Sequence, residues 1–245
     1  MPDSAFIPGF PSLADHALIW IFGWIMPFLS GVKGRESLDG VIFTESIRRR
    51  FYLGNSLFLF IAAAVVSLSW ILQRRPMRSL GFRDVEPGTE AVVIGLVLII
   101  LLCWLGDFLI TYRRQAAGNA SASEKGAFPS FMPVHSSELP AYLLLSLSAA
   151  VFEETIYRGF MVTYFLPASR GAEGWPLAAA TIPALLFSLA HYYQGWKAVV
   201  KIWGFSVGLG GIFMISGSLW PVMAIHFIID FGGGCLAMYL GRRTR

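Results

Sequence analysis

Two adjacent carboxylates and an arginine, Glu153, Glu154 and Arg158, lie inside a stretch of sequence that is otherwise apolar. At the centre of a membrane helix each such charge costs about 2.5 to 3.5 kcal/mol, so three of them cost about 7 to 10 kcal/mol. On a helix, Glu154 and Arg158 are four residues apart and can pair, whereas Glu153 points about 100° away. The spacing therefore predicts one tethered carboxylate, one free carboxylate, and a polar stripe that faces protein or trapped water.

Three further ionisable residues, His191, His226 and Asp230, lie in later apolar segments. Ionisable groups inside membrane segments usually line a cavity, pair with one another and mark a functional site. Hydrolysis needs a base that takes a proton from water and donors aimed at the oxygen that becomes negative. Glu153 can be that base, His191 can orient the water, and His226 can donate to the oxyanion.

The composition indicates a membrane protein rather than a soluble one. The chain has 245 residues, 56% of them hydrophobic and only 14% charged, and its mean hydropathy is +0.62. Apolar runs of about 20 residues cross about 30 Å of hydrocarbon. We therefore expect an all-α fold: a polytopic bundle of about seven or eight transmembrane helices around a polar intramembrane cavity, with the lipid bilayer as a partner. Basic residues cluster at the ends of the apolar runs, which marks membrane boundaries and argues against nucleic acid as a partner.

The elements that must position the ionisable residues follow from these apolar runs. We expect crossings at residues 13–29, 51–72, 90–112, 139–166, 175–193, 197–217 and 218–240. Residues 1–137 would supply about three N-terminal helices with loops that do not form an independent domain. Residues 138–245 would form the catalytic core, and the whole chain one structural domain.

Charged residues in the N-terminal helices have simpler interpretations. Asp107 lies close to Arg113 and Arg114, which favours an ion pair at a helix end. Asp15 and His16 lie near the start of the first predicted helix, where we expect interfacial residues rather than a site.

Four short motifs follow one another in the second half of the chain: Glu153-Glu154-x-x-x-Arg158-Gly159, Phe187-x-x-x-His191, Gly217-Ser218-Leu219-Trp220-Pro221 and His226-x-x-x-Asp230. Together they resemble the CAAX prenyl protease and bacteriocin-processing (CPBP) family of intramembrane glutamic proteases, over about residues 138–240. Residues 80–83, with the sequence LGFR, weakly resemble a turn upstream in that family.

The resemblance implies a role for each residue of these motifs. Glu153 and His191 would activate water, and His226 with Asp230 would form the oxyanion hole. Glu154 would belong to the catalytic group and, with Arg158, would hold the site together. No metal or other cofactor is expected.

Asp230 departs from the commonest form of the last motif, since the family often has asparagine there. The amide of asparagine donates hydrogen bonds, whereas an ionised aspartate only accepts them. Asp230 therefore either stays protonated and donates, or orients His226 and leaves the oxyanion mainly to that histidine. The spacing of four residues between the two favours the second role.

Two other interpretations fit the same residues. Glu153, His191 and His226 would form a zinc site with one position open for water, although the sequence has no HExxH motif. A non-enzymatic membrane protein, such as a bacteriocin self-immunity factor, a scaffold or a transporter, would use the polar cavity without catalysis.

The predicted function is that of a metal-independent intramembrane endopeptidase. Its substrate would be a membrane-associated or lipidated peptide or protein, because nothing in the sequence identifies a particular lipid group. The protein is expected to be an integral, multi-pass component of the inner membrane of a prokaryote.

Overall fold

The computed structural model describes residues 10–117, 130–166 and 175–241, and all regular secondary structure within these ranges is helical. Six of the described helices are long and apolar enough to cross a membrane, and a seventh, over Leu177–Ala190, is shorter. The prediction of an all-α membrane bundle is confirmed, and the count of seven or eight crossings was approximate.

The helices follow the predicted segments with shifted ends. The first candidate span, Leu13–Leu38, is longer than predicted and contains α1 (Leu13–Ile19), α2 (Met26–Phe28) and α3 (Gly34–Leu38), joined by π-helical turns. The span Ser136–Phe165 contains α6 (Leu139–Ser148) and α7 (Thr163–Phe165). The remaining long helices are α4 (Glu45–Leu72), α5 (Glu90–Ala116), α8 (Trp175–Ala190), α9 (Trp196–Ser216) and α10 (Leu219–Gly241).

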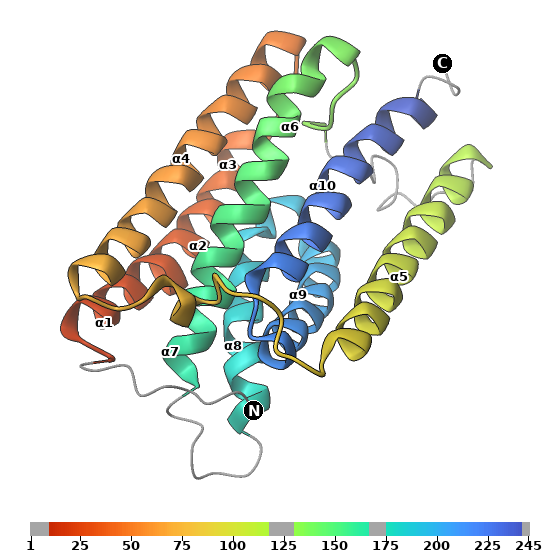
Figure 1. The fold of residues 1–245 in the computed structure, drawn as a ribbon. Helices are drawn as coiled ribbons and strands as arrows, with labels where there is room; N and C mark the ends of the chain where they lie inside the picture. The colour runs from red at the N-terminus through yellow and green to blue at the C-terminus, as the bar shows by residue number, and fades with distance from the viewer. Residues whose placement is uncertain (1–9, 118–129, 167–174, 242–245) are drawn as a thin grey trace.

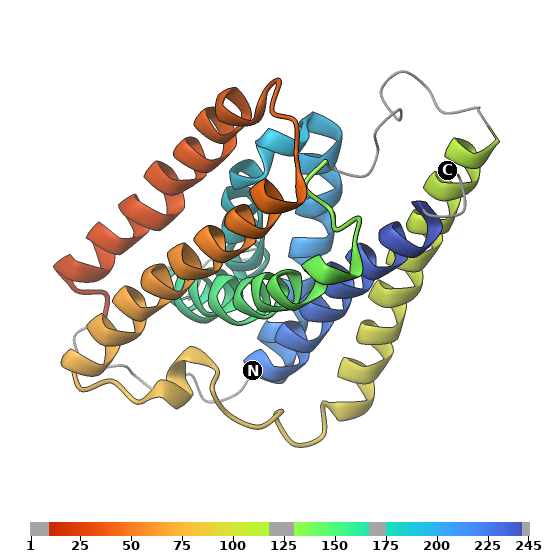
Figure 2. The same ribbon diagram turned by 90° about the horizontal axis from the view of Figure 1, so that it is seen from above.

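The span that contains α6 and α7 lies at the centre of the bundle, as Figures 1 and 2 show. Helices α4, α8, α9 and α10 all pack against it. Helix α5 lies at the edge beside α10 in both views and contacts α9 and α10. The segment with the two adjacent glutamates is therefore enclosed by helices from both halves of the chain.

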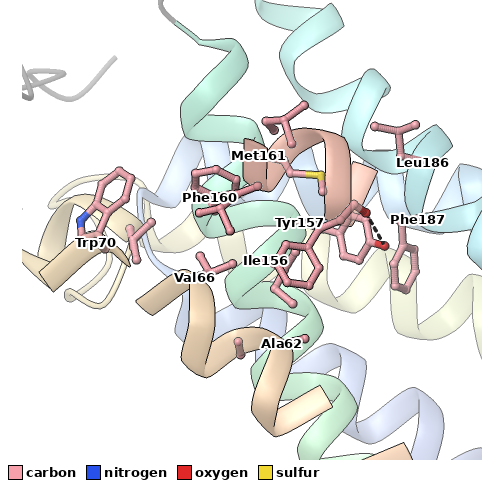
Figure 3. Packing of buried hydrophobic residues seen from close by; sticks show 14 residues of the cluster. Ala62, Val66, Trp70, Ile156, Tyr157, Phe160, Met161, Leu186 and Phe187 are labelled. Atoms are coloured by element: carbon pink, nitrogen blue, oxygen red, sulfur yellow. Dashed lines mark hydrogen bonds between the residues drawn. The ribbon is translucent and has the colours of Figure 1, made fainter. Parts of the chain in front are cut away.

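An apolar cluster holds the central span against its neighbours. Ala62, Val66 and Trp70 lie along α4 and face Ile156 and Phe160 of the central span, as Figure 3 shows. Their spacing of four residues places them on one face of α4. Because each of these side chains is buried, the cluster fixes α4 and the central span relative to one another.

Two buried ion pairs also hold the N-terminal helices in place, one of them within the N-terminal half and one to the second half of the chain. The Asp15 carboxylate is fully buried and accepts two hydrogen bonds of 2.9 Å from the Arg75 guanidinium. Arg48 at the start of α4 donates a 2.6 Å hydrogen bond to Glu138, just before α6. The sequence predicted no partner for Asp15, because Arg75 lies 60 residues away along the chain.

Asp107 also has a different partner from the one predicted. Its carboxylate accepts hydrogen bonds of 2.8 and 2.9 Å from Lys201 on α9. Both side chains are about half exposed, at 48% for Asp107 and 53% for Lys201. This pair joins α5 to α9 at the outer surface of the bundle.

Candidate active site

The two glutamates lie where the central span departs from regular α-helix. Residues Ala149–Glu153 and Thr155–Val162 form π-helical turns, and Glu154 lies between the two segments. π-Helical turns inside α-helices frequently occur at functional sites. The structure places Glu153 on the lining of a cavity and turns Glu154 into the protein interior, where it is fully buried.

Glu154 and Arg158 form the ion pair that their spacing predicts. Arg158 Nη1 lies 2.8 Å from Glu154 Oε1, and the arginine is 1% exposed. Arg158 Nη2 donates to the hydroxyl of Ser206 on α9 at 2.6 Å and to its carbonyl oxygen at 3.3 Å. The pair is thus anchored to α9, through a serine that no sequence motif singled out.

His226 on α10 connects this ion pair to Glu153. Its Nδ1 lies 2.6 Å from Glu154 Oε1, and its Nε2 lies 3.7 Å from Glu153 Oε2. Nε2 also lies 3.4 Å from Asp230 Oδ2, one helical turn further along α10. Since ionised carboxylates only accept hydrogen bonds, Nδ1 donates to Glu154, and the other ring nitrogen faces two carboxylates. At least one proton must therefore be shared among His226, Glu153 and Asp230.

His191 lies just after the end of α8 and belongs to the same group. Its Nδ1 lies 2.9 Å from the carbonyl oxygen of Phe187, which can only accept a hydrogen bond. Nδ1 therefore carries a proton, and in a neutral ring Nε2 carries the lone pair. This tautomer leaves an acceptor that suits the orientation of a water molecule.

Phe187 touches three members of the group at once. The Arg158 guanidinium lies 4.9 Å from the centre of its ring, in cation–π geometry. The ring centres of His191 and His226 lie 4.7 and 6.0 Å from it. The phenylalanine of the second motif therefore packs between the two histidines and supports the arginine.

A cavity of about 350 Å³ connects these groups. Glu153, Arg158, His191, His226 and Asp230 line it, whereas Glu154 does not. A further part of the lining comes from the N-terminal helices: Phe22, Met26 and Ser30 of the first span, and Phe51, Asn55, Phe58, Leu59 and Ala62 of α4. The predicted polar cavity is therefore present, and both halves of the chain enclose it.

The third motif and the upstream LGFR turn, residues 80–83, are joined by hydrogen bonds. Gly217 ends α9 with a φ of 62°, a left-handed conformation that glycine adopts without strain, and its carbonyl oxygen accepts from Arg83 Nε at 2.8 Å. Leu219 N donates to the Gly81 carbonyl at 2.9 Å, and the Ser218 hydroxyl donates to the Arg83 carbonyl at 2.6 Å. These bonds fix the start of α10, and with it the imidazole that faces the cavity.

Gly159 of the first motif serves close packing. A Cβ atom at this position would lie 2.8 Å from the carbonyl oxygen of Leu80, closer than a real Cβ can approach. Glycine therefore allows the central span to contact the 3₁₀ turn Met77–Leu80. The same turn continues into the segment that holds the start of α10.

Tyr142 of α6 supports the last motif from the other side. Its hydroxyl donates a 3.0 Å hydrogen bond to the carbonyl oxygen of Asp230. Its ring occupies the space where a side chain at Gly234 would be, since a Cβ there would collide with the ring. No motif in the sequence singled out Tyr142, which lies eleven residues before Glu153.

The structure brings Glu153, His191, His226 and Asp230 to one cavity, which Arg158 also lines, and Glu154 lies behind His226 and pairs with Arg158. Within residues 10–117, 130–166 and 175–241, no group of three or more His, Cys, Asp and Glu side chains has the arrangement that holds a metal ion. The zinc interpretation therefore has no three-residue ligand set in this part of the chain.

No curated protein and no solved structure shows a significant match to this chain. One protein family does match: residues 135–232 fit the family described as type II CAAX prenyl endopeptidase Rce1-like. The matched segment runs from just before α6 into α10 and includes every ionisable residue of the site. Together with the six candidate spans, the match supports an integral, multi-pass membrane protein. The resemblance seen in the motifs is thereby confirmed: the part of this chain that carries the site is similar to the Rce1-like type II CAAX prenyl endopeptidases.

Proposed function

We propose that this protein is a metal-independent intramembrane endopeptidase that hydrolyses a peptide bond of a membrane-associated or lipidated peptide or protein. One observation carries the proposal: Glu153 Oε2 lies 3.7 Å from His226 Nε2 on a cavity inside membrane-spanning helices. Ionisable groups in membrane segments are costly to bury, and they usually mark a functional site. We further propose the inner membrane of a prokaryote as its location.

In the proposed reaction Glu153 takes a proton from a water molecule in the cavity. The water oxygen bonds to the carbonyl carbon of the substrate, and the carbonyl oxygen becomes negative. When the carbon–nitrogen bond breaks, Glu153 returns the proton to the departing amine. The two products then carry the hydroxyl group and the hydrogen of the consumed water, and the enzyme regains its starting state.

His191 would help to hold the attacking water. Its Nδ1 hydrogen is occupied by the carbonyl of Phe187, so Nε2 can accept the second hydrogen of the water. Orientation by a fixed acceptor lowers the entropic part of the barrier.

His226 would stabilise the oxyanion, because a proton on its Nε2 points toward the cavity. Glu154 holds the opposite nitrogen and fixes the plane of the ring, and Arg158 holds Glu154. Asp230 would support the proton on Nε2 as an acceptor, which agrees with its distance of 3.4 Å. In this arrangement Glu154, Arg158 and Asp230 are positioning residues, and Glu153, His191 and His226 touch the reacting atoms.

The experiment compares the wild-type protein with the variant Glu153→Gln. Both proteins are purified, reconstituted into liposomes and incubated with a peptide library, and new N-termini are identified by mass spectrometry. We expect cleavage products only with the wild-type protein. Identical product lists from two equally folded proteins would contradict the proposal.

A second comparison, between the wild type and Glu153→Ala, separates the enzymatic from the non-enzymatic interpretation. If the protein is an immunity factor, scaffold or transporter, the cellular phenotype of a deletion is restored by Glu153→Ala as well as by the wild type. If the phenotype depends on peptide hydrolysis, Glu153→Ala fails to restore it although the protein is present in the membrane.

A further inference from the structure

A peptide chain that enters this cavity brings backbone N–H and C=O groups that lose their water. Unpaired backbone groups in an apolar environment cost several kcal/mol each, so a peptide site needs partners for them. The residues assigned to hydrolysis, Glu153, His191 and His226, form only one part of the cavity lining. Further partners must come from other polar side chains of the lining, and α4 supplies one of them.

The cavity-lining residues of α4 form one stripe along the helix. They are Phe51, Asn55, Phe58, Leu59 and Ala62. Spacings of three and four residues place them on a single face. Four of the five are apolar, so the amide of Asn55 is the polar group that this face presents to the cavity.

Asn55 keeps one half of its amide unpaired. Its Nδ2 donates a 2.8 Å hydrogen bond to the carbonyl oxygen of Phe51 in the preceding turn. Since a carbonyl only accepts, this contact identifies the NH₂ end of the amide and leaves Oδ1 as an acceptor. Oδ1 has no hydrogen-bond partner within the described part of the chain.

Helix α4 is also in the right place to contact a bound peptide. It packs directly against Ala149–Glu153, the π-helical turn that ends at the proposed base. The side chain of Asn55 is partly exposed and lines the same cavity as Glu153 and His226. A peptide held beside Glu153 therefore lies in the cavity that the stripe on α4 also lines.

We propose that Asn55 is a substrate-binding residue whose side-chain oxygen accepts a hydrogen bond from a backbone N–H group of an extended peptide. This inference rests on the proposed function only in that the occupant of the cavity is a peptide. Because every residue type except proline carries a backbone N–H, Asn55 contributes affinity for peptide chains in general, and the apolar side chains beside it contribute selectivity.

Binding to a protein that lacks the base tests the inference without relying on cleavage. Glu153→Gln and the double variant Glu153→Gln/Asn55→Leu are reconstituted in nanodiscs, and retention of two peptide pools is measured. The first pool contains N-acetylated decapeptides of random sequence. The second contains the same decapeptides with every backbone nitrogen methylated. We expect the double variant to retain about 5- to 10-fold less of the first pool, as for the loss of one hydrogen bond, and an unchanged amount of the second.

A matched control lies one residue further along α4. The hydroxyl of Ser56 donates to the Tyr52 carbonyl at 2.8 Å, and Ser56 is buried away from the cavity lining. Glu153→Gln/Ser56→Ala should retain both pools as Glu153→Gln does. Thermal unfolding of all three proteins verifies that each is folded.

Three results would overturn the inference: no retention of the first pool by Glu153→Gln, equal retention of that pool by Glu153→Gln and the Asn55 variant, or an equal loss from both pools. The inference and the proposed function can fail separately. If the wild-type protein cleaves nothing but retention depends on Asn55, the endopeptidase proposal fails and the peptide site stands.

Discussion

The two carboxylate–guanidinium pairs Arg48–Glu138 and Arg158–Glu154 are both buried, but their second carboxylate oxygens differ in hydrogen-bond partners. Glu138 accepts from Arg48 through Oε1 at 2.6 Å, and its Oε2 accepts from the backbone nitrogens of residues 134 and 135 at 2.6 and 2.8 Å. Glu154 concentrates its contacts on Oε1, and its Oε2 has no partner within the described residues. The first pair is closed, whereas the second is incomplete on its own.

The difference extends to what each pair touches. Neither Arg48 nor Glu138 lines the cavity, while Arg158 does, and Glu154 holds the imidazole of His226 that faces it. Both pairs are fully buried ion pairs, so burial of charge alone does not distinguish a structural pair from a functional one. Contact with a group that reaches an accessible cavity is what distinguishes them.

The largest expected effect on activity comes from substitution of Glu153, the glutamate of the site that has no arginine partner. Glu153→Gln removes the proposed base, so we expect activity to fall by about 10²- to 10⁴-fold while the midpoint of thermal unfolding is unchanged or higher. The measurement is the initial rate of cleavage of an identified peptide. Glu138→Gln is the matched variant of the closed pair. It should lower the unfolding midpoint and leave the rate per folded molecule unchanged, and a loss of rate as large as that of Glu153→Gln would refute the comparison.

The second-largest effect is expected when the arginine of each ion pair is replaced. Arg158→Met and Arg48→Met each leave a buried carboxylate without its partner, which costs about 3 to 5 kcal/mol of stability. Only Arg158→Met should also lower kcat, because it releases Glu154 and with it the ring of His226. Unfolding in denaturing detergent and kcat per folded molecule are measured in parallel. If Arg48→Met lowers kcat to the same extent, the distinction between the two pairs is wrong.

A smaller effect is expected at Asp230. Asp230→Asn replaces an acceptor with an amide that can also donate to the oxyanion, so activity should stay within about tenfold of the wild type. The check is kcat/KM on the same peptide. Complete loss of activity in a folded variant would exclude both proposed roles of this residue, the donor and the support for His226.

Removal of metal should have almost no effect on the rate. The proposed base and donors need no metal ion, so incubation with a strong chelator followed by gel filtration should change kcat/KM less than about twofold. Metal content is measured before and after by mass spectrometry. A loss of activity that added zinc restores would favour the zinc interpretation of Glu153, His191 and His226.

The smallest effect belongs to the exposed pair Asp107–Lys201, which extends the comparison to a third type of charge pair. Exposed ion pairs contribute about 0 to 1 kcal/mol in water. Asp107→Asn should therefore shift the unfolding midpoint slightly and leave the cleavage rate unchanged. A loss of stability as large as that of Arg48→Met would show that lipid, rather than water, surrounds this pair.

The ionisable residues that line the cavity could be predicted from the sequence because of the free-energy cost of charge in an apolar helix. Ionisable side chains inside apolar helices are costly to bury, and this cost alone singles out Glu153, His191, His226 and Asp230. The pairing of Glu154 with Arg158 followed from a local rule of spacing. These predictions required no knowledge of how distant helices pack.

The errors and omissions share a different cause. Asp15 and Asp107 find partners far away in the sequence, and local spacing assigned them nearby ones or none. Ser206 and Asn55 are common residue types whose meaning comes only from the helix face on which they lie. Long-range partners depend on the packing of α4, α8 and α9 around the central span, and no spacing rule contains that information.

The side chains proposed to activate water come from the second half of the polypeptide, whereas the first half supplies a separate, mostly apolar part of the cavity lining. If the protein is the proposed endopeptidase, substitutions along the inner face of α4 should change which peptides are accepted and leave the proposed hydrolytic residues in place. For an engineer, this separation makes the N-terminal helices the natural place to begin when a new cleavage preference is wanted.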